Sequence, residues 1–223
     1  MTVSVVICHY GAITHTLHAM NSVPAGVELI VVDNDGGLRS LRTEATVIRP
    51  ARNLGFAAGC NLGARAASGE FIIFLNNDAY TADPLWIDKL LAPFDDPEVG
   101  IVGARLVYPD GRLQHAGVAI DFTRPPGQEA WNILEDHPAC QLVATTGACM
   151  AVRSAVFAQL GGFDEGYWNG YEDVDLCLSA AAHGIRIRYN PAVTIHHLES
   201  ASGPERWTAV AENITRLRRK WSP

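Results

Sequence analysis

Short runs of apolar residues recur along the first third of the chain, and each stops abruptly at polar side chains. The runs cover residues 3–8, 28–32, 46–49 and 71–75. They are too short for buried helices and show little polar alternation, which is typical of strands covered on both faces. Helical segments are expected between them, over 13–21 and from about 53 to 68. The pattern predicts a doubly wound, mostly parallel α/β sheet.

Polar residues follow three of these predicted strands. His9 and Tyr10 follow the first, Asp33 and Asn34 follow the second, and Asn-Asn-Asp at 76–78 follows the last. Carboxyl ends of parallel strands meet at the edge of the sheet where ligands bind. Carboxylate and amide groups there can hold a hard divalent cation and bind sugar or phosphate oxygens. The alternative is a set of polar turns, because Asn and Asp favour turns.

The regular alternation is lost after residue 78. The expected elements are a helix over 84–94, strands over 99–108, 113–120 and 146–152, and a short helix capped by Ser154. The Pro-rich polar stretch 121–139 predicts a mobile loop of the kind that closes over active sites. This half of the chain therefore predicts a smaller, mixed portion of the sheet.

An acidic cluster opens a predicted helix near residue 172. Glu172, Asp173 and Asp175 lie in its first turn, and the aromatic residues Trp168 and Tyr171 precede them. Carboxylates in a first turn are stabilised by the helix dipole, so stability alone is one explanation. Aromatic rings beside the acids favour a second explanation, a functional site that stacks on a sugar ring. Asp173 is expected to stay ionised through the same dipole.

A late strand delivers two neighbouring histidines, His196 and His197, and then Glu199. Neutral imidazole is a common metal ligand. Neighbouring residues on a strand face opposite ways, so the strand itself leaves open which histidine faces a site.

Composition narrows the classes of protein. The 223 residues carry a net charge of -7. This argues against a nucleic-acid-binding protein, which needs a basic surface. The five cysteines are odd in number and widely spaced, as expected for reduced thiols in a cytoplasmic protein. No apolar run reaches membrane-spanning length, so any work at a membrane is expected at its inner face.

The C-terminal segment predicts an amphipathic helix. Its apolar seam comprises Trp207, Val210, Ile214, Leu217 and Trp221, and its last turn carries Arg216, Arg218, Arg219 and Lys220. Packing of the seam on its own domain is the favoured interpretation. The alternatives are a peripheral membrane contact with anionic lipid, or a homodimer.

Taken in order, these motifs resemble the inverting glycosyltransferases of family 2, which have the GT-A fold, and among them the rhamnosyltransferase-like branch that builds cell-surface polysaccharides. The resemblance rests on His9-Tyr10, on 32–34, 52–63 and 75–78, on Gly147, on 161–165 and 172–177, and on His196. One departure is Asn76, which stands where such enzymes commonly carry the first carboxylate of an Asp-X-Asp metal motif. Asp78 is then the sole carboxylate of that motif.

The resemblance implies one GT-A domain over 1–223, with a nucleotide-binding half at 1–78 and an acceptor-binding half at 79–223. It implies transfer of a sugar, with rhamnose as a candidate, from a dTDP- or UDP-linked donor to a saccharide or lipid-linked acceptor, with Mg²⁺ or Mn²⁺ as cofactor.

The resemblance also implies roles for single residues. Asp173 would be the catalytic base, Trp168 and Glu172 would bind the acceptor, and Asp78 and His196 would hold the metal. The nucleotide sugar would be bound by His9, Tyr10, Asp33, Asn53, Asn61, Asn77 and Asp78.

Two other classes stay open. A nucleotidyltransferase that makes nucleotide sugars also uses an α/β sheet and magnesium, but its glycine-rich phosphate loop with Arg and Lys is not seen after the first strand. A non-catalytic binding protein of the same fold would not need Asp173 and His196 together.

Overall fold

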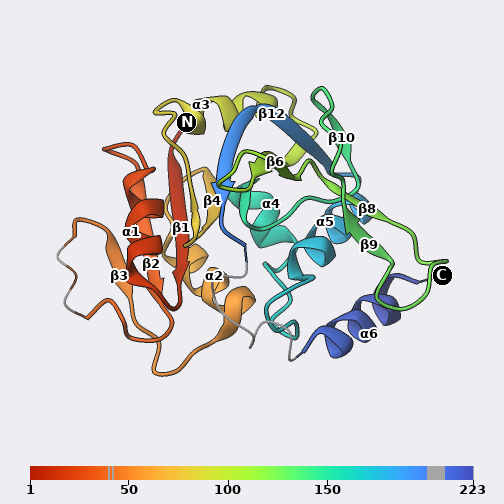
Figure 1. The fold of residues 1–223 in the computed structure, drawn as a ribbon, viewed down its shortest axis with the longest axis horizontal. Helices are drawn as coiled ribbons and strands as arrows, with labels where there is room; N and C mark the ends of the chain where they lie inside the picture. Colours follow the sequence, from red (N-terminus) through yellow and green to blue (C-terminus); the bar gives the residue numbers. More distant parts are fainter. Residues whose placement is uncertain (40, 42, 200–208, 223) are drawn as a thin grey trace.

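The N-terminal strands form one half of a ten-stranded sheet in the computed structural model, which describes residues 1–39, 41, 43–199 and 209–222. β1 (Val3–His9) lies between β4 (Phe71–Asn76) and β2 (Glu28–Asp33), and β3 (Thr46–Ile48) forms the edge. All of these neighbours are parallel, as the apolar runs predict (Figure 1). Their carboxyl ends therefore share one edge of the sheet.

The second half of the sheet is mixed, as predicted. β11 (Cys149–Arg153) is antiparallel to both of its neighbours, β4 and β6 (Val99–Val107). β12 (Arg186–His197) is parallel to β6, and β10 (Cys140–Leu142) pairs with its outer side. The short strand β5 (Ala79–Tyr80) pairs with the end of β12, which brings the histidines next to the 76–78 segment.

Alternate residues of the central strands pack into two separate cores. Val5 and Ile7 face α1 (Ile13–Asn21) and α3 (Trp86–Leu91), which the 3₁₀ turn Ala92–Asp95 extends. Val6 and Cys8 face α2 (Gly55–Ala66), α4 (Ser154–Gln159) and α5 (Glu172–Ala182). This alternation follows from the two-residue period of a strand, and it places helices on both faces of the sheet.

The structure corrects two expectations in the second half. The expected strand 113–120 divides at Gly117, whose φ of +121° few other residues adopt. β7 (Leu113–His115) pairs with β6, whereas β8 (Val118–Ile120) leaves the main sheet and pairs with β9 (Ala130–Asn132) inside the expected loop. Ser154 does not cap α4, because its hydroxyl donates instead to the carbonyl oxygen of Gly69 at 2.5 Å.

The C-terminal helix α6 (Val210–Trp221) packs on its own domain, while Trp207 lies outside the described residues. Leu217 is fully buried in the core that also holds α5. Lys220 Nζ lies 2.7 Å from Asp175 Oδ2 on α5. No helix in the described part of the chain is long and apolar enough to cross a membrane. All five cysteines are free.

Candidate active site

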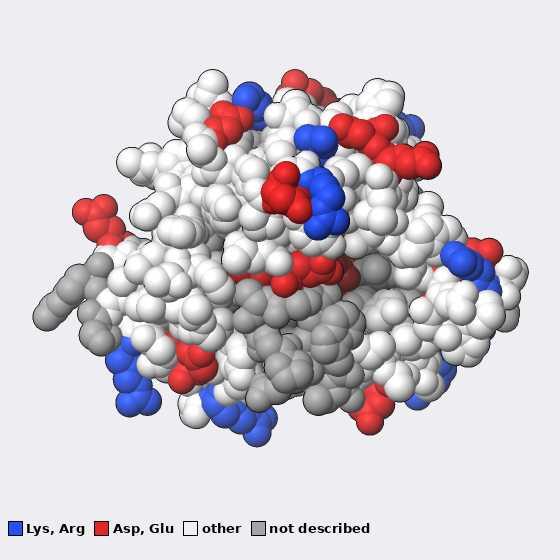
Figure 2. Space-filling view, in the orientation of Figure 1, with Lys and Arg blue, Asp and Glu red and all other residues white. Residues whose placement is uncertain are grey.

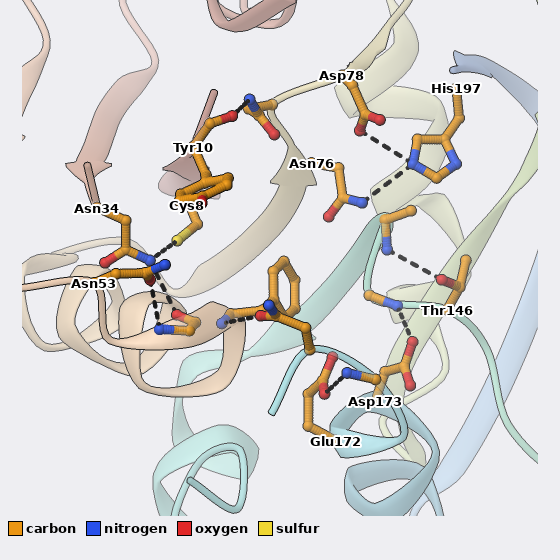
Figure 3. A pocket seen from close by; sticks show the side chains of 17 residues that line it. Cys8, Tyr10, Asn34, Asn53, Asn76, Asp78, Thr146, Glu172, Asp173 and His197 are labelled. Atoms are coloured by element: carbon orange, nitrogen blue, oxygen red, sulfur yellow. Dashed lines mark hydrogen bonds and ion pairs between the residues drawn. The ribbon is translucent and has the colours of Figure 1, made fainter. Parts of the chain in front are cut away.

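A cleft opens at the carboxyl edge of the parallel strands, where the polar residues were expected to meet. Its lining residues include Cys8, Tyr10, Asn34, Asn53, Asn76, Asp78, Thr146, Glu172, Asp173 and His197 (Figure 3). The space in it is about 910 Å³ when the open mouth is included. Figure 2 shows carboxylate groups in a hollow near the centre of the view.

Asn34 organises one end of this cleft. Its Nδ2 donates to the carbonyl oxygen of Gly55 at 3.1 Å, and its Oδ1 accepts from Leu54 N at 3.2 Å. These bonds tie the end of β2 to the start of α2. Gly55 has a φ of +77°, and a Cβ on it would lie 2.9 Å from the Trp168 ring, so only glycine fits there. Asn53 and Tyr10 line the cleft beside this turn.

His9 and Asp33 lie behind the cleft wall and do not line it. His9 is fully buried, with Nδ1 2.6 Å from Thr16 Oγ1 and Nε2 3.2 Å from Asp35 Oδ1. Burial lowers the pKa of His9, although the two carboxylates oppose this shift. The ligand atoms of His9, Asp33 and Asp35 lie within 4.8 Å of one another, so this group could also hold a cation.

Asp78 and His197 meet at the opposite end of the cleft. The distance from Asp78 Oδ1 to His197 Nε2 is 3.1 Å, and both side chains are almost fully buried. The expectation that His196 would lie beside Asp78 is wrong. His196 pairs in register with Tyr80, its ring stacks on that of Tyr80 at 5.4 Å between centroids, and it does not line the cleft.

The donor atoms around Asp78 fit a divalent cation. His197 Nδ1 lies 2.7 Å from Gln114 Oε1, so Nδ1 carries the proton and Nε2 offers its lone pair towards Asp78. Asn76 Oδ1 is buried and has no hydrogen-bond partner among the described residues. The Nδ2 of the same amide lies 3.1 Å from His197 Nε2, so Oδ1 points away from the imidazole (Figure 3). The donor set at this point is therefore one imidazole nitrogen and one carboxylate, which Mn²⁺ or Mg²⁺ accepts.

Asp173 is held at the start of α5. Its Oδ2 accepts from Gly147 N at 2.8 Å, and its Oδ1 accepts from Val174 N at 2.8 Å. Burial raises the pKa of Asp173, although these backbone N–H groups act in the opposite direction. The expectation that the helix dipole keeps Asp173 ionised left out this burial, which acts in the opposite direction on the pKa. A raised pKa brings the carboxyl closer to neutral pH, as suits a general base.

Of three further residues that were expected to bind the donor or the acceptor, the structure places only one in the lining of the cleft. Asn61 does not line the cleft. Its Nδ2 donates to Phe163 O at 2.8 Å, and its Oδ1 accepts from Phe163 N at 2.9 Å, which joins α2 to the turn before α5. Trp168 lines neither described cavity, because its ring covers Gly55. Glu172 lines the cleft, and its Oε2 accepts from Gly170 N at 2.6 Å.

A second cavity adjoins the cleft, and Asp173 borders both. Its other lining residues include Gln114, His115, Trp131, Asn132 and Asn213. The indole of Trp131 is 41% exposed, although it belongs to a short strand. Burial lowers the pKa of His115 to about 4, so this imidazole is neutral at physiological pH. The described residues that line this cavity include no Lys or Arg.

Comparison with known proteins identifies the family. Residues 4–160 match the family model described as Glycosyl transferase family 2. The chain belongs to this family. The resemblance noted in the sequence is thus confirmed, and the matched region runs from β1 to just beyond α4.

Several family 2 relatives have assigned names. The chain is 38% identical over 151 residues to the O-antigen biosynthesis protein RfbC of Myxococcus xanthus, which covers 64% of this chain and 12% of that protein. It is 30% identical over 179 residues to an N-acetylglucosaminyl-diphospho-decaprenol L-rhamnosyltransferase of Mycobacterium tuberculosis, which covers 68% of this chain and 58% of that protein. The chain thus spans only part of the length of these relatives.

Solved structures confirm the GT-A fold of this family 2 domain. GalNAc-T7 superposes with a TM-score of 0.75 at 19% identity, covering 99% of this chain and 48% of that one. The mannosyltransferase PcManGT of Pyrobaculum calidifontis gives a TM-score of 0.71 at 17% identity, covering 99% of this chain and 65% of that one. At these identities the likeness shows the fold alone.

The sequence left several lining residues of this family 2 site without a role. Asn169, Thr146 and Phe56 all line the cleft. Asn169 has a φ of +50°, and its Oδ1 accepts from Phe56 N at 2.8 Å across 113 residues of chain. Its place in the sequence, between an aromatic pair and the acidic cluster, was the available signal.

Proposed function

We propose that this chain is a metal-dependent, inverting glycosyltransferase that moves a sugar from a nucleoside diphosphate to a saccharide. The single observation that carries the proposal is the position of Asp173, which borders both the cleft and the second cavity. A carboxylate at that boundary can take a proton from an acceptor on one side while the donor lies on the other.

The donor would occupy the cleft. In this proposal Tyr10, Asn34 and Asn53 bind the nucleoside, and Asn77 and Asp78 lie by the phosphates. Asn77 Nδ2 donates to the carbonyl oxygen of Tyr10 at 3.0 Å, which links the two residues. Related folds support a nucleotide-sugar donor: TarS of S. aureus was solved with UDP-GlcNAc, and PcManGT with GDP-Man and Mn²⁺. We propose dTDP or UDP as the nucleotide.

Asp78 Oδ1 and His197 Nε2, which lie 3.1 Å apart, would hold the cation. When bound, Mn²⁺ or Mg²⁺ would neutralise negative charge on the diphosphate leaving group. The protein offers few ligands, so binding of the cation should depend strongly on the nucleotide.

Asp173 would act as the general base. It would accept the proton of the acceptor hydroxyl as that oxygen attacks the anomeric carbon from the side opposite the diphosphate, which inverts the configuration. The bond from Gly147 N fixes Oδ2 of the carboxylate, and no covalent enzyme intermediate forms.

The acceptor would occupy the second cavity. Trp131 offers a partly exposed indole, with the guanidinium of Arg124 4.3 Å from the centroid of its ring. The neutral His115 and the amides of Gln114 and Asn132 offer uncharged hydrogen-bonding groups. The described lining lacks a cation, which favours an uncharged sugar over an acidic one. Rhamnosyl transfer in polysaccharide synthesis is the candidate reaction, because relatives carry rhamnosyltransferase names.

A membrane contact through α6 has little support. Arg216 and Lys220 bind Asp164, and Arg218 NH1 donates to the carbonyl oxygen of Arg124 at 3.1 Å. These cations are already engaged inside the domain. We place the reaction in the cytoplasm because all five thiols are free. Equal sedimentation with anionic and neutral liposomes is the expected result.

A thermal-shift panel tests this function. Purified protein is heated with UDP, dTDP, their sugar conjugates and ATP, each with and without Mn²⁺. Selective binding to the native state raises Tm, by an amount that grows with ligand excess over Kd. A metal-dependent shift with a diphosphate sugar, followed by release of nucleoside diphosphate, is expected. A shift only with a nucleoside triphosphate would favour the nucleotidyltransferase class, and binding without turnover would favour a non-catalytic protein.

A further inference from the structure

Asn213 is a polar residue on the buried side of α6. Its side chain is only 2% exposed, one turn before the buried Leu217. Its Nδ2 donates to the carbonyl oxygens of Trp168 at 2.9 Å and Gly170 at 3.0 Å, and its Oδ1 accepts from Trp168 N at 3.2 Å. A single amide thus satisfies several backbone groups of one short segment, although it lies 43 residues further along the chain than Gly170.

The segment that Asn213 binds has an unfavourable backbone conformation. Asn169 and Tyr171 have φ values of +50° and +72°, in the left-handed region that side chains disfavour. Tyr171 is also the N-cap of α5, and no side chain caps that helix end. Such a conformation persists only where surrounding contacts determine it. The hydrogen bonds of Asn213 are contacts of this kind.

The same segment carries the active-site geometry. Asn169 lines both cavities, and its Oδ1 accepts from Phe56 N at the start of α2. Gly170 N donates to Glu172 Oε2 at 2.6 Å, and Asp173 directly follows Glu172 in the first turn of α5. A shift of the segment would therefore move the wall between the cavities and the first turn of α5 together.

We propose that Asn213 is a positioning residue for catalysis, which fixes the backbone from Trp168 to Gly170 and thereby sets the place of Asn169 and Asp173. This proposal rests on the proposed function. Asn213 also borders the second cavity, but its side-chain hydrogen bonds to Trp168 and Gly170 are directed at the segment, and in this role it acts through the segment. Direct contact with the acceptor is the competing explanation, and it would change the acceptor KM.

Variants on one helix separate positioning from simple stability. Asn213→Ala removes the amide that hydrogen-bonds the segment. Leu217→Ala removes a fully buried side chain of the same helix that is apolar and forms no hydrogen bonds. Leu217→Ala should lower Tm by at least about 4 °C and leave kcat within about threefold of the wild type. Asn213→Ala should lower kcat by about 10-fold or more, because small displacements of reacting groups are costly.

The readouts are Tm, the Kd for UDP with Mn²⁺, the acceptor KM, and kcat for release of nucleoside diphosphate from the donor sugar. Expected for Asn213→Ala is an unchanged Kd and an unchanged acceptor KM with reduced kcat; a raised acceptor KM with unchanged kcat would show direct acceptor binding and overturn the proposal. The proposal is overturned if kcat stays at the wild-type value, or if both variants lose kcat in proportion to Tm. Asn213→Ser, which offers a hydroxyl in place of the amide, replaces the alanine variant if that one does not fold, with the same outcomes. Absence of UDP binding and turnover in the wild type would instead count against the proposed function.

Discussion

Replacement of Asp173 by Asn changes the proposed base while keeping its shape. The carboxylate accepts from Gly147 N through Oδ2 and from Val174 N through Oδ1. An amide keeps only one oxygen acceptor, so one of these hydrogen bonds is lost. Loss of a general base costs about 100-fold to 10,000-fold in rate, or about 2.7 to 5.4 kcal/mol in the activation barrier. We expect kcat to fall by at least about 100-fold.

The same substitution should change stability much less. The lost hydrogen bond costs about 1 kcal/mol. Folding raises the pKa of Asp173, so this group stabilises the fold below its unfolded pKa of about 3.9, and that contribution is lost as pH rises through the higher folded value. At neutral pH the amide avoids the cost of a partly buried charge. The two effects oppose each other, and Tm should change by less than about 4 °C at pH 7.

The assay combines kcat, Tm and the Kd for the donor nucleotide across pH 4 to 8. The wild-type kcat should rise with pH through the raised pKa of Asp173, because only the ionised carboxylate accepts a proton. Tm of the wild type relative to Asp173→Asn should improve as pH falls. Asp175→Asn is the matched control, since Asp175 binds Lys220 and Trp221 and should affect Tm more than kcat. Turnover within about threefold of the wild type in Asp173→Asn, with donor binding intact, would refute the assignment.

Four further substitutions test other parts of the structure. His197→Ala should abolish stimulation by Mn²⁺ whereas His196→Ala should retain it, and the reverse pattern in a manganese titration would contradict the orientation of β12. Asn61→Ala should lower the free energy of unfolding by about 2 to 4 kcal/mol, because buried backbone groups of Phe163 lose their partners, and leave UDP affinity unchanged; weaker UDP binding in calorimetry would restore its role in donor binding. Trp131→Ala should raise the acceptor KM by about 10-fold or more without changing the donor KM, and unchanged acceptor kinetics would place the acceptor elsewhere.

The periodicity of apolar residues was sufficient to predict the central strands and the edge of the sheet where their polar ends meet. The runs before His9, Asp33 and Asn76 become β1, β2 and β4, because a chain that is apolar on both faces is stable only inside a sheet covered by helices. Parallel pairing then brings the polar ends to one edge, which is why Tyr10 and Asp78 line one cleft.

Residue type alone could not separate binding residues from those that hold the fold together. Asn53 lies just before α2 and Asn61 in the middle of that helix, yet only Asn53 lines the cleft. Asn61 is used by the backbone of Phe163, a partner 102 residues away. Asn213 likewise lies among apolar residues for a reason found only in the Trp168–Gly170 backbone. Buried amides need partners, and the partners come from distant parts of the chain.

The two histidines show most directly what could not be predicted from the sequence. The sequence determined that β12 would present His196 and His197 to opposite sides. Which side faces Asp78 depends on register, and β12 changes its register with β6 between Asn190 and Thr194. A shift of one residue exchanges the faces of every later side chain. Only the tertiary pairing, with His197 opposite Ala79, places that imidazole beside Asp78.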